Sequence, residues 1–435
     1  MRNKILKVMA VIFAVALISP SFAAVESVKV GGDITMYGVL RPNFNVGPAN
    51  EKSQNFFQTS IRVYVTADLT DNVQAMIRLI DEMDWGSDLV GNDTRDILLD
   101  LGYIKVTDLM IPGLTLTVGR QEIQFGEGLV VGSAYNGYTY ANDSPIAARD
   151  LGLQKAFDAI RADYEVATLP ITLTVFGAKI TEDQTSLFGR VPTGDTGDRN
   201  LYGLNIGWRP DICALDVYYV RDDTLHTDQN VDTAGLRVTG EIPAVENLGL
   251  KLEYAKQFGE DAAGDDNKGW ALLFGADYKF PVNMNPYVKL NYNLFSGNDN
   301  DNDNENEGWR MVFPSNIGSR MGQVWYALTS DPNNRGRGIR ESNLQAINLG
   351  FGLQPVEKVK LALDAYWLKG AEDIVGTEDD IGTEIDLGIE YQYTEDLSFG
   401  LSYGMLLTGD LFDTVQFGRD DDNPWQLLAT MKLAF

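Results

Sequence analysis

Hydrophobic and polar residues alternate along most of the chain, in segments of about ten residues, the length of a membrane-crossing strand. In the segment 60–69, Ile61, Val63 and Val65 occupy one face of an extended chain, and Arg62 and Tyr64 occupy the other. Because successive side chains of a strand point to opposite faces, such a segment has one apolar side and one polar side. The pattern therefore predicts strands with one face in an apolar environment and one face in water.

The same template predicts eighteen strands, an even number. They lie near residues 28–44, 55–69, 73–83, 96–107, 114–123, 156–167, 170–180, 199–209, 213–221, 232–241, 248–258, 267–280, 287–296, 343–353, 358–369, 383–393, 397–407 and 424–435.

The links between these segments alternate between short turns and long polar stretches. Long links lie at 84–95, 124–155, 182–198, 222–231, 298–342, 370–382 and 408–423. Bacterial outer-membrane barrels show this alternation, because their turns on the periplasmic side are short and their extracellular loops are long. The sequence therefore predicts an all-β fold, a closed antiparallel transmembrane β-barrel of about eighteen strands.

A secreted soluble β-protein is the alternative fold, since alternation also occurs where one sheet packs on another. Three features favour the barrel: the alternating link lengths, the terminal Phe435, and apolar faces that end in aromatic residues, such as that of 270–280. A terminal aromatic residue resembles the signal read by the barrel-assembly machinery, which is therefore an expected partner. The other expected partner is outer-membrane lipid.

The N-terminus has the three parts of a secretory signal peptide. Basic residues (Arg2, Lys4 and Lys7) precede an apolar stretch at 8–18, and a small-residue cleavage site ends at Ala23. We therefore expect a signal peptide at 1–23, a barrel at 24–435, and localisation in the outer membrane of a diderm (Gram-negative) bacterium.

Composition excludes several classes of function. The 62 Asp and Glu residues outnumber the 35 Lys and Arg residues, which argues against nucleic acid as a partner. One cysteine, Cys213, and one histidine, His226, leave little for redox, metal or acid–base chemistry, so we expect no enzyme and no cofactor. The acidic run 299–307 offers oxygen atoms for Ca²⁺, although it lacks the spacing of an EF-hand.

The polar faces of the predicted strands carry charges of both signs, which would line the pore. Candidate pore-lining residues are Arg41, Arg62, Arg78, Arg161, Asp163, Glu165, Arg237, Asp364, Glu384, Asp386 and Glu390. In one interpretation these groups form cross-strand ion pairs on a wet wall. In the other, separate cationic and anionic sectors create a field across the bore.

A family resemblance appears around the fifth and sixth segments. Residues 119–123, followed by Phe125-Gly126, Val131-Gly132 and 155–161, resemble the core motif of the alginate-export family of outer-membrane porins. The resemblance implies an eighteen-stranded barrel with an arginine-rich channel for an anionic polysaccharide. It also implies that Arg120 and Arg161 lie at the constriction, and that residues 125–154 form a loop folded into the bore.

Strict alternation from Leu114 points Arg120 at lipid, which conflicts with a pore-lining role. A bulge at Gly119, or a position at the outer rim of the barrel, would resolve this conflict.

These observations together predict an outer-membrane porin for passive, weakly selective diffusion of small hydrophilic solutes, namely sugars, sugar acids or organic anions. The stretch 298–342 is expected to be a long acidic extracellular loop. The alternative function is a structural barrel that sheathes a partner such as a cytochrome.

Overall fold

The computed structural model describes residues 27–44, 53–86, 97–133, 149–181, 198–224, 229–261, 264–300, 303–315, 318–330, 342–374, 378–413 and 423–435. The predicted signal peptide and His226 lie outside these residues.

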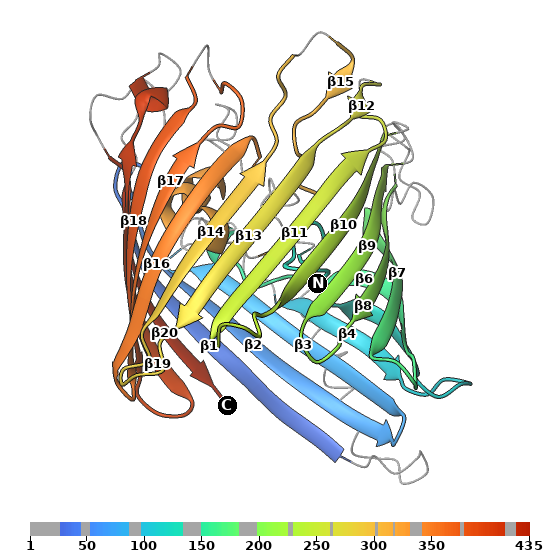
Figure 1. The fold of residues 1–435 in the computed structure, drawn as a ribbon. Coiled ribbons are helices and arrows are strands. Elements are labelled where there is room, and N and C mark those ends of the chain that lie inside the picture. Colours follow the sequence, from blue (N-terminus) through green and yellow to red (C-terminus); the bar gives the residue numbers. More distant parts are fainter. Residues whose placement is uncertain are drawn as a thin grey trace.

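Eighteen strands form one antiparallel sheet in which each strand pairs with its neighbours in the chain and β20 pairs with β1, so the sheet closes into a barrel (Figure 1). The first nine are β1 (Ser27–Arg41), β2 (Gln54–Thr70), β3 (Val73–Asp84), β4 (Leu98–Val106), β5 (Leu114–Gln121), β6 (Phe157–Glu165), β7 (Ile171–Thr181), β8 (Arg199–Trp208) and β9 (Ala214–Thr224). The others are β10 (Gln229–Glu241), β11 (Leu248–Phe258), β13 (Trp270–Lys279), β14 (Tyr287–Phe295), β16 (Leu344–Val356), β17 (Val359–Lys369), β18 (Asp380–Gln392), β19 (Leu397–Thr408) and β20 (Trp425–Ala434).

The barrel confirms the predicted fold class. Each predicted segment contains one strand of the barrel, and the boundaries differ by three residues or fewer. Short turns gather at the lower end of the barrel in Figure 1, and the long connections leave from the upper end, as the link lengths predicted. The strands form because their alternating pattern places apolar residues on a single face.

The outward face of the wall is apolar. Ile160, Val175 and Leu349 are each more than half exposed although they lie in the middle of paired strands. Large apolar side chains in such positions form the lipid-facing belt of a membrane barrel.

No helix within the described ranges is long and apolar enough to cross a membrane.

Shorter elements lie in the connections. They are β12 (Asp266–Asn267), β15 (Glu305–Asn306), η2 (Arg149–Leu151), α2 (Gly318–Met321), α3 (Gln323–Ser330) and η3 (Asp410–Asp413). β12 and β15 pair in parallel at the upper end of the barrel (Figure 1).

The hydrophobic core sits inside the barrel. It combines inward residues of the strands, such as Phe176 and Ala255, with residues of two connections, such as Phe125, Phe313 and Trp325. Figure 1 shows the helices of residues 318–330 behind β14 and β16, within the ring of strands. The barrel is thus partly filled by its own chain.

Candidate functional site

Two segments from different connections meet inside the barrel. The segment 122–133 follows β5, and the segment 307–315 follows β15. Val131 and Phe313 form a parallel bridge, in which the Phe313 amide donates to the Val130 carbonyl at 2.9 Å and the Gly132 amide donates to the Phe313 carbonyl at 2.8 Å. These backbone hydrogen bonds make the two segments one unit, which we call the inner segments.

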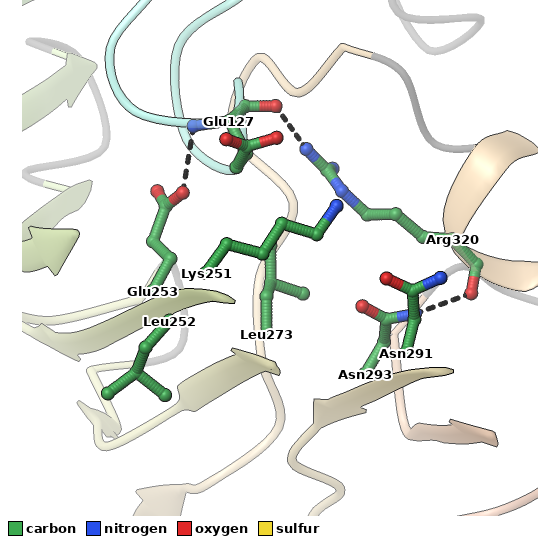
Figure 2. A pocket seen from close by; sticks show the side chains of 8 residues that line it. All are labelled: Glu127, Lys251, Leu252, Glu253, Leu273, Asn291, Asn293 and Arg320. Carbon is green, nitrogen blue, oxygen red and sulfur yellow. Dashed lines mark hydrogen bonds between the residues drawn. The ribbon is translucent and has the colours of Figure 1, made fainter. Parts of the chain in front are cut away.

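Glu127 attaches the inner segments to the barrel wall. Its amide donates to Glu253 on β11 at 2.8 Å, and its carboxylate forms an ion pair with Arg237 on β10. Its carbonyl accepts a hydrogen bond from Arg320 of α2, and Tyr218 on β9 donates to the other oxygen of Glu253 at 2.7 Å. Figure 2 shows the contacts of Glu127 with Glu253 and Arg320.

The charges around Glu127 favour its ionised form. Burial alone raises the pKa of Glu127, but the hydrogen bond from Arg237 and the positive charges of Arg237, Lys251 and Arg320 lower it further than burial raises it. The net effect is a pKa below the ordinary value of a glutamate. Glu127 is therefore held as an anion between cations.

A small polar cavity of about 130 Å³ lies beside this junction. Figure 2 shows the Lys251 ammonium group pointing into the space between Glu127 and Arg320, above Asn291 and Asn293. Among the described residues Lys251 forms no ion pair. The cavity is thus lined by hydrogen-bonding groups and is large enough for water.

Most of the predicted pore-lining arginines form ion pairs with nearby carboxylates. Arg62 pairs with Asp33 at 3.0 Å, and Arg161 pairs with Asp163 at 2.9 Å. The remaining pairs are Arg41 with Asp150 at 2.5 Å, Arg78 with Asp100 and Glu122 at 2.5 Å each, and Arg237 with Asp216 at 3.3 Å.

Two of the four predicted anions on β17 and β18 pair with lysines. Asp364 pairs with Lys289 at 2.8 Å, and Glu390 pairs with Lys360 at 3.5 Å. Glu165 lies exposed at the end of β6. These contacts agree with the interpretation in which the charged residues of the wall form local ion pairs, rather than separate cationic and anionic sectors.

Glu384 and Asp386 hold α3, a helix that the alternating pattern did not predict. Glu384 is fully buried and accepts hydrogen bonds from the amides of Val324 and Trp325 at 2.6 and 2.9 Å. Asp386 accepts from the amide and the side chain of Gln323 at 3.2 and 3.1 Å. Both carboxylates thus bind the first turn of α3, where helix amides lack partners.

This contact corrects the expectation for residues 298–342. The stretch was expected to be a long acidic extracellular loop, but its described residues 318–330 lie within the barrel and contact inward side chains of β14, β18 and β20. Trp309, Phe313 and Trp325 are buried there. These aromatic residues inside a polar stretch were the available signal, but they do not form the alternating pattern used to find strands.

Arg120 lies on the outward face of the wall, so the structure does not place it in the pore. It pairs at 2.9 Å with Asp158, which is its cross-strand partner and lies on the same face of β6 as the exposed Ile160. Gly119 has a φ of +121°, a value that favours glycine, and Arg120 is next to last in β5, where the strand reaches the long loop. The conflict in strand alternation is therefore resolved by an outer-rim position.

The expected calcium site is only partly described, because residues 301 and 302 lie outside the described ranges. In the remainder of the described chain no group of three or more His, Cys, Asp or Glu side chains is arranged to hold a metal ion. The middle of the predicted inward loop, 134–148, is also outside these ranges.

Comparison with solved structures finds barrels of the same architecture. OpdQ of Pseudomonas aeruginosa matches with a TM-score of 0.60 and 11% identity, covering 95% of this chain and 99% of that one. The outer membrane protein opdK of P. aeruginosa matches with a TM-score of 0.61 and 11% identity, over 94% and 100% of the two chains. A BenF-like porin of Pseudomonas fluorescens Pf-5 matches with a TM-score of 0.61 and 11% identity, over 94% and 99%. At these identities the matches establish the fold.

Comparison with curated protein sequences finds no match. The family described as "Alginate export" matches residues 27–419, which is most of the chain. This match confirms the resemblance seen around residues 119–161, and neither the family nor the fold is that of an enzyme. With its closed barrel and apolar outer belt, the chain is an outer-membrane protein that belongs to the alginate-export family.

Proposed function

We propose that this barrel is a passive channel for small hydrophilic solutes, weakly selective among sugars, sugar acids and organic anions. The observation that carries the proposal is the junction at Glu127, where inner segment 122–133 meets the wall and α2. The junction narrows the bore and leaves a polar cavity beside it.

The geometry supports a channel whose width is set by the inner segments. Phe125 packs against Phe176 and Tyr218 of the wall, with ring centroids 5.4 and 6.2 Å apart. Such packing holds the segment against one side of the barrel, so the described start of the predicted inward loop, 125–133, acts as a constriction rather than as a free lid. The solutes pass beside it along polar groups.

The same packing argues against a barrel that sheathes a cytochrome. A sheath needs an empty bore, whereas here Leu129, Phe313 and Trp325 form a buried core inside the wall. The channel needs no cofactor, and its other proposed partners are outer-membrane lipid and the barrel-assembly machinery.

Conductance of the purified protein in planar bilayers tests the proposal. We expect stable single-channel currents in KCl that fall when a sugar acid is added. Arg237→Gln removes the charge that holds Glu127 and should change the ratio of anion to cation permeability. The matched control is Arg120→Gln, which removes the same charge from the outward face. The absence of any stable conductance, or equal effects of the two substitutions, would contradict the proposal.

A further inference from the structure

A second and larger cavity, of about 590 Å³, opens at the short-turn end of the barrel. It spans the ends of five neighbouring strands, β13, β14, β16, β17 and β18, together with the turns beside them. Volumes between about 300 and 1,000 Å³ are usual for sites that bind small molecules. Because bacterial barrels place short turns in the periplasm, this cavity faces that side.

The cavity exists because small residues replace large ones on the inner face. Gly388 and Ala362 form part of its lining, and a Cβ built on Gly388 would meet only the Cβ of Ala362 within 4 Å, at 3.8 Å. Nearby, the ring of Tyr287 lies over Gly352, where a Cβ would come within 2.4 Å of it. The result is a hollow with an aromatic ring at one side.

Two lysines of this cavity are available to a ligand, unlike the arginines higher in the bore. Among the described residues Lys279 forms no ion pair. Lys360 is only loosely paired with Glu390, at 3.5 Å, and the two side chains are 65% and 50% exposed. A cation held by a buried carboxylate binds a solute only after that pair is broken, which is costly. An exposed pair of this kind contributes little and exchanges readily with a ligand.

We propose that this cavity binds a hydroxylated monocarboxylate, such as a sugar acid, at the periplasmic mouth of the channel. The ligand carboxylate lies between Lys279 and Lys360, its hydroxyl groups donate to Glu390, and its apolar ring face lies on Tyr287. The inference rests on the proposed channel function and identifies a substrate class and a binding site for it.

Glucuronate and glucose are the probes, because they differ only in the carboxylate. In planar bilayers glucuronate should block the current of the unaltered protein at lower concentration than glucose. Lys279→Gln and Gly388→Val should each raise the half-blocking concentration of glucuronate at least fivefold, the first by removing a charge and the second by filling the hollow.

Lys432→Gln is the matched control. Lys432 lies opposite the buried Thr35 at the same end of the barrel, but on β20 and outside the cavity, so its loss should leave the block by glucuronate unchanged. If Lys432→Gln and Lys279→Gln raise the half-blocking concentration of glucuronate equally, the proposed site is wrong, because the block then depends only on the net charge at the periplasmic mouth. Equal block by glucose and glucuronate would overturn the recognition of a carboxylate.

Calorimetric titration of the same variants with glucuronate in detergent separates this inference from the channel function. If the protein does not conduct but binds glucuronate, and Lys279→Gln weakens that binding, the proposed binding site stands and the proposed channel function is wrong. If the protein conducts but does not bind glucuronate, the proposed channel function stands and the proposed binding site is wrong. Folding of each variant is checked by the shift in gel mobility between unheated and heated samples, and Lys279→Gln tests the site even if Gly388→Val does not fold.

Discussion

Glu127 makes polar contacts through its backbone amide, its backbone carbonyl and its carboxylate. Its amide, carbonyl and carboxylate contact Glu253, Arg320 and Arg237, which belong to three different elements. Hydrogen bonds to charged groups each contribute about 1.5–3 kcal/mol. A substitution at this residue therefore disturbs inner segment 122–133, α2 and the wall together.

Glu127→Gln should loosen inner segment 122–133, because the amide lacks the negative charge that pairs with Arg237, whose remaining ion pair is the longer one with Asp216. We expect more frequent fluctuations of the single-channel current at neutral pH. The pKa of Glu127 is lowered in the folded protein, so its contribution to stability is complete above the ordinary glutamate pKa of 4.5 and is lost as the pH falls through the lowered pKa.

When the pH falls through the lowered pKa of Glu127, the single-channel current of the unaltered protein should fluctuate as that of the variant does at neutral pH. The variant should show no further change over the same pH range. A variant whose currents remain as quiet as those of the unaltered protein would show that the carboxylate does not hold the segments.

At the scale of elements, the inner segments depend on positions where a side chain does not fit. Gly128 has a φ of +73°, and a Cβ there would lie 2.1 Å from the hydroxyl of Ser315 in the other segment. Residues other than glycine pay about 1–2 kcal/mol for this backbone conformation alone. The close approach of the two segments therefore requires glycine at this position.

Gly128→Ala should separate the inner segments without unfolding the barrel. We expect larger and noisier currents, while the temperature at which the protein loses its compact gel mobility changes little. Gly264→Ala is the control, because Gly264 has a similar φ of +88° but nothing within 4 Å of an added Cβ. If both substitutions give the same currents, backbone strain alone is responsible and the contact with Ser315 is unimportant.

At the scale of the whole molecule, the barrel has two solvents, lipid outside and water inside. Neighbouring residues of one strand therefore experience opposite environments. Leu290 of β14 is 44% exposed on the outer face, and Asn291 faces the inner cavity beside Lys251. This contrast offers a direct test of which face meets lipid.

Leu290→Lys should destabilise the barrel by about 2–4 kcal/mol, the cost of a lysine near the middle of the bilayer. Asn291→Lys places the same charge in the polar interior and should change the stability far less. Denaturant unfolding of both variants in lipid vesicles measures the difference in free energy. A smaller loss for Leu290→Lys than for Asn291→Lys would show that the faces are assigned the wrong way round.

The C-terminal residue gives a second prediction at this scale. Phe435 pairs through its backbone with Gly32 of β1, yet its residue surface is 61% exposed. Phe435→Ala should keep the backbone hydrogen bonds and lower the amount of folded protein in the outer membrane, as expected of an assembly signal. The control is Phe399→Ala, which removes an exposed aromatic side chain from β19. Equal yields of the two variants in membrane fractions would contradict a role for the terminal ring.

The sequence by itself determined the wall of this protein. Every strand of the barrel was predictable because the alternation seen at Ile61, Arg62 and Val63 is a local pattern, and because the parity of short and long links limits the strand count. The inward direction of Arg62 and Arg161 was predictable for the same reason, since a strand of period two has only two faces.

Only the tertiary structure decided what fills the bore. The contact of Glu127 with Arg320 joins residues 193 positions apart, and the contact of Gln323 with Gln426 joins residues 103 apart. No periodic pattern marks such pairs, because irregular segments are positioned by whichever wall groups satisfy their amides and bury their aromatic rings. The outward direction of Arg120 followed from the alternation of the strand, whereas its height at the rim was decided only by how the closed strands align with each other.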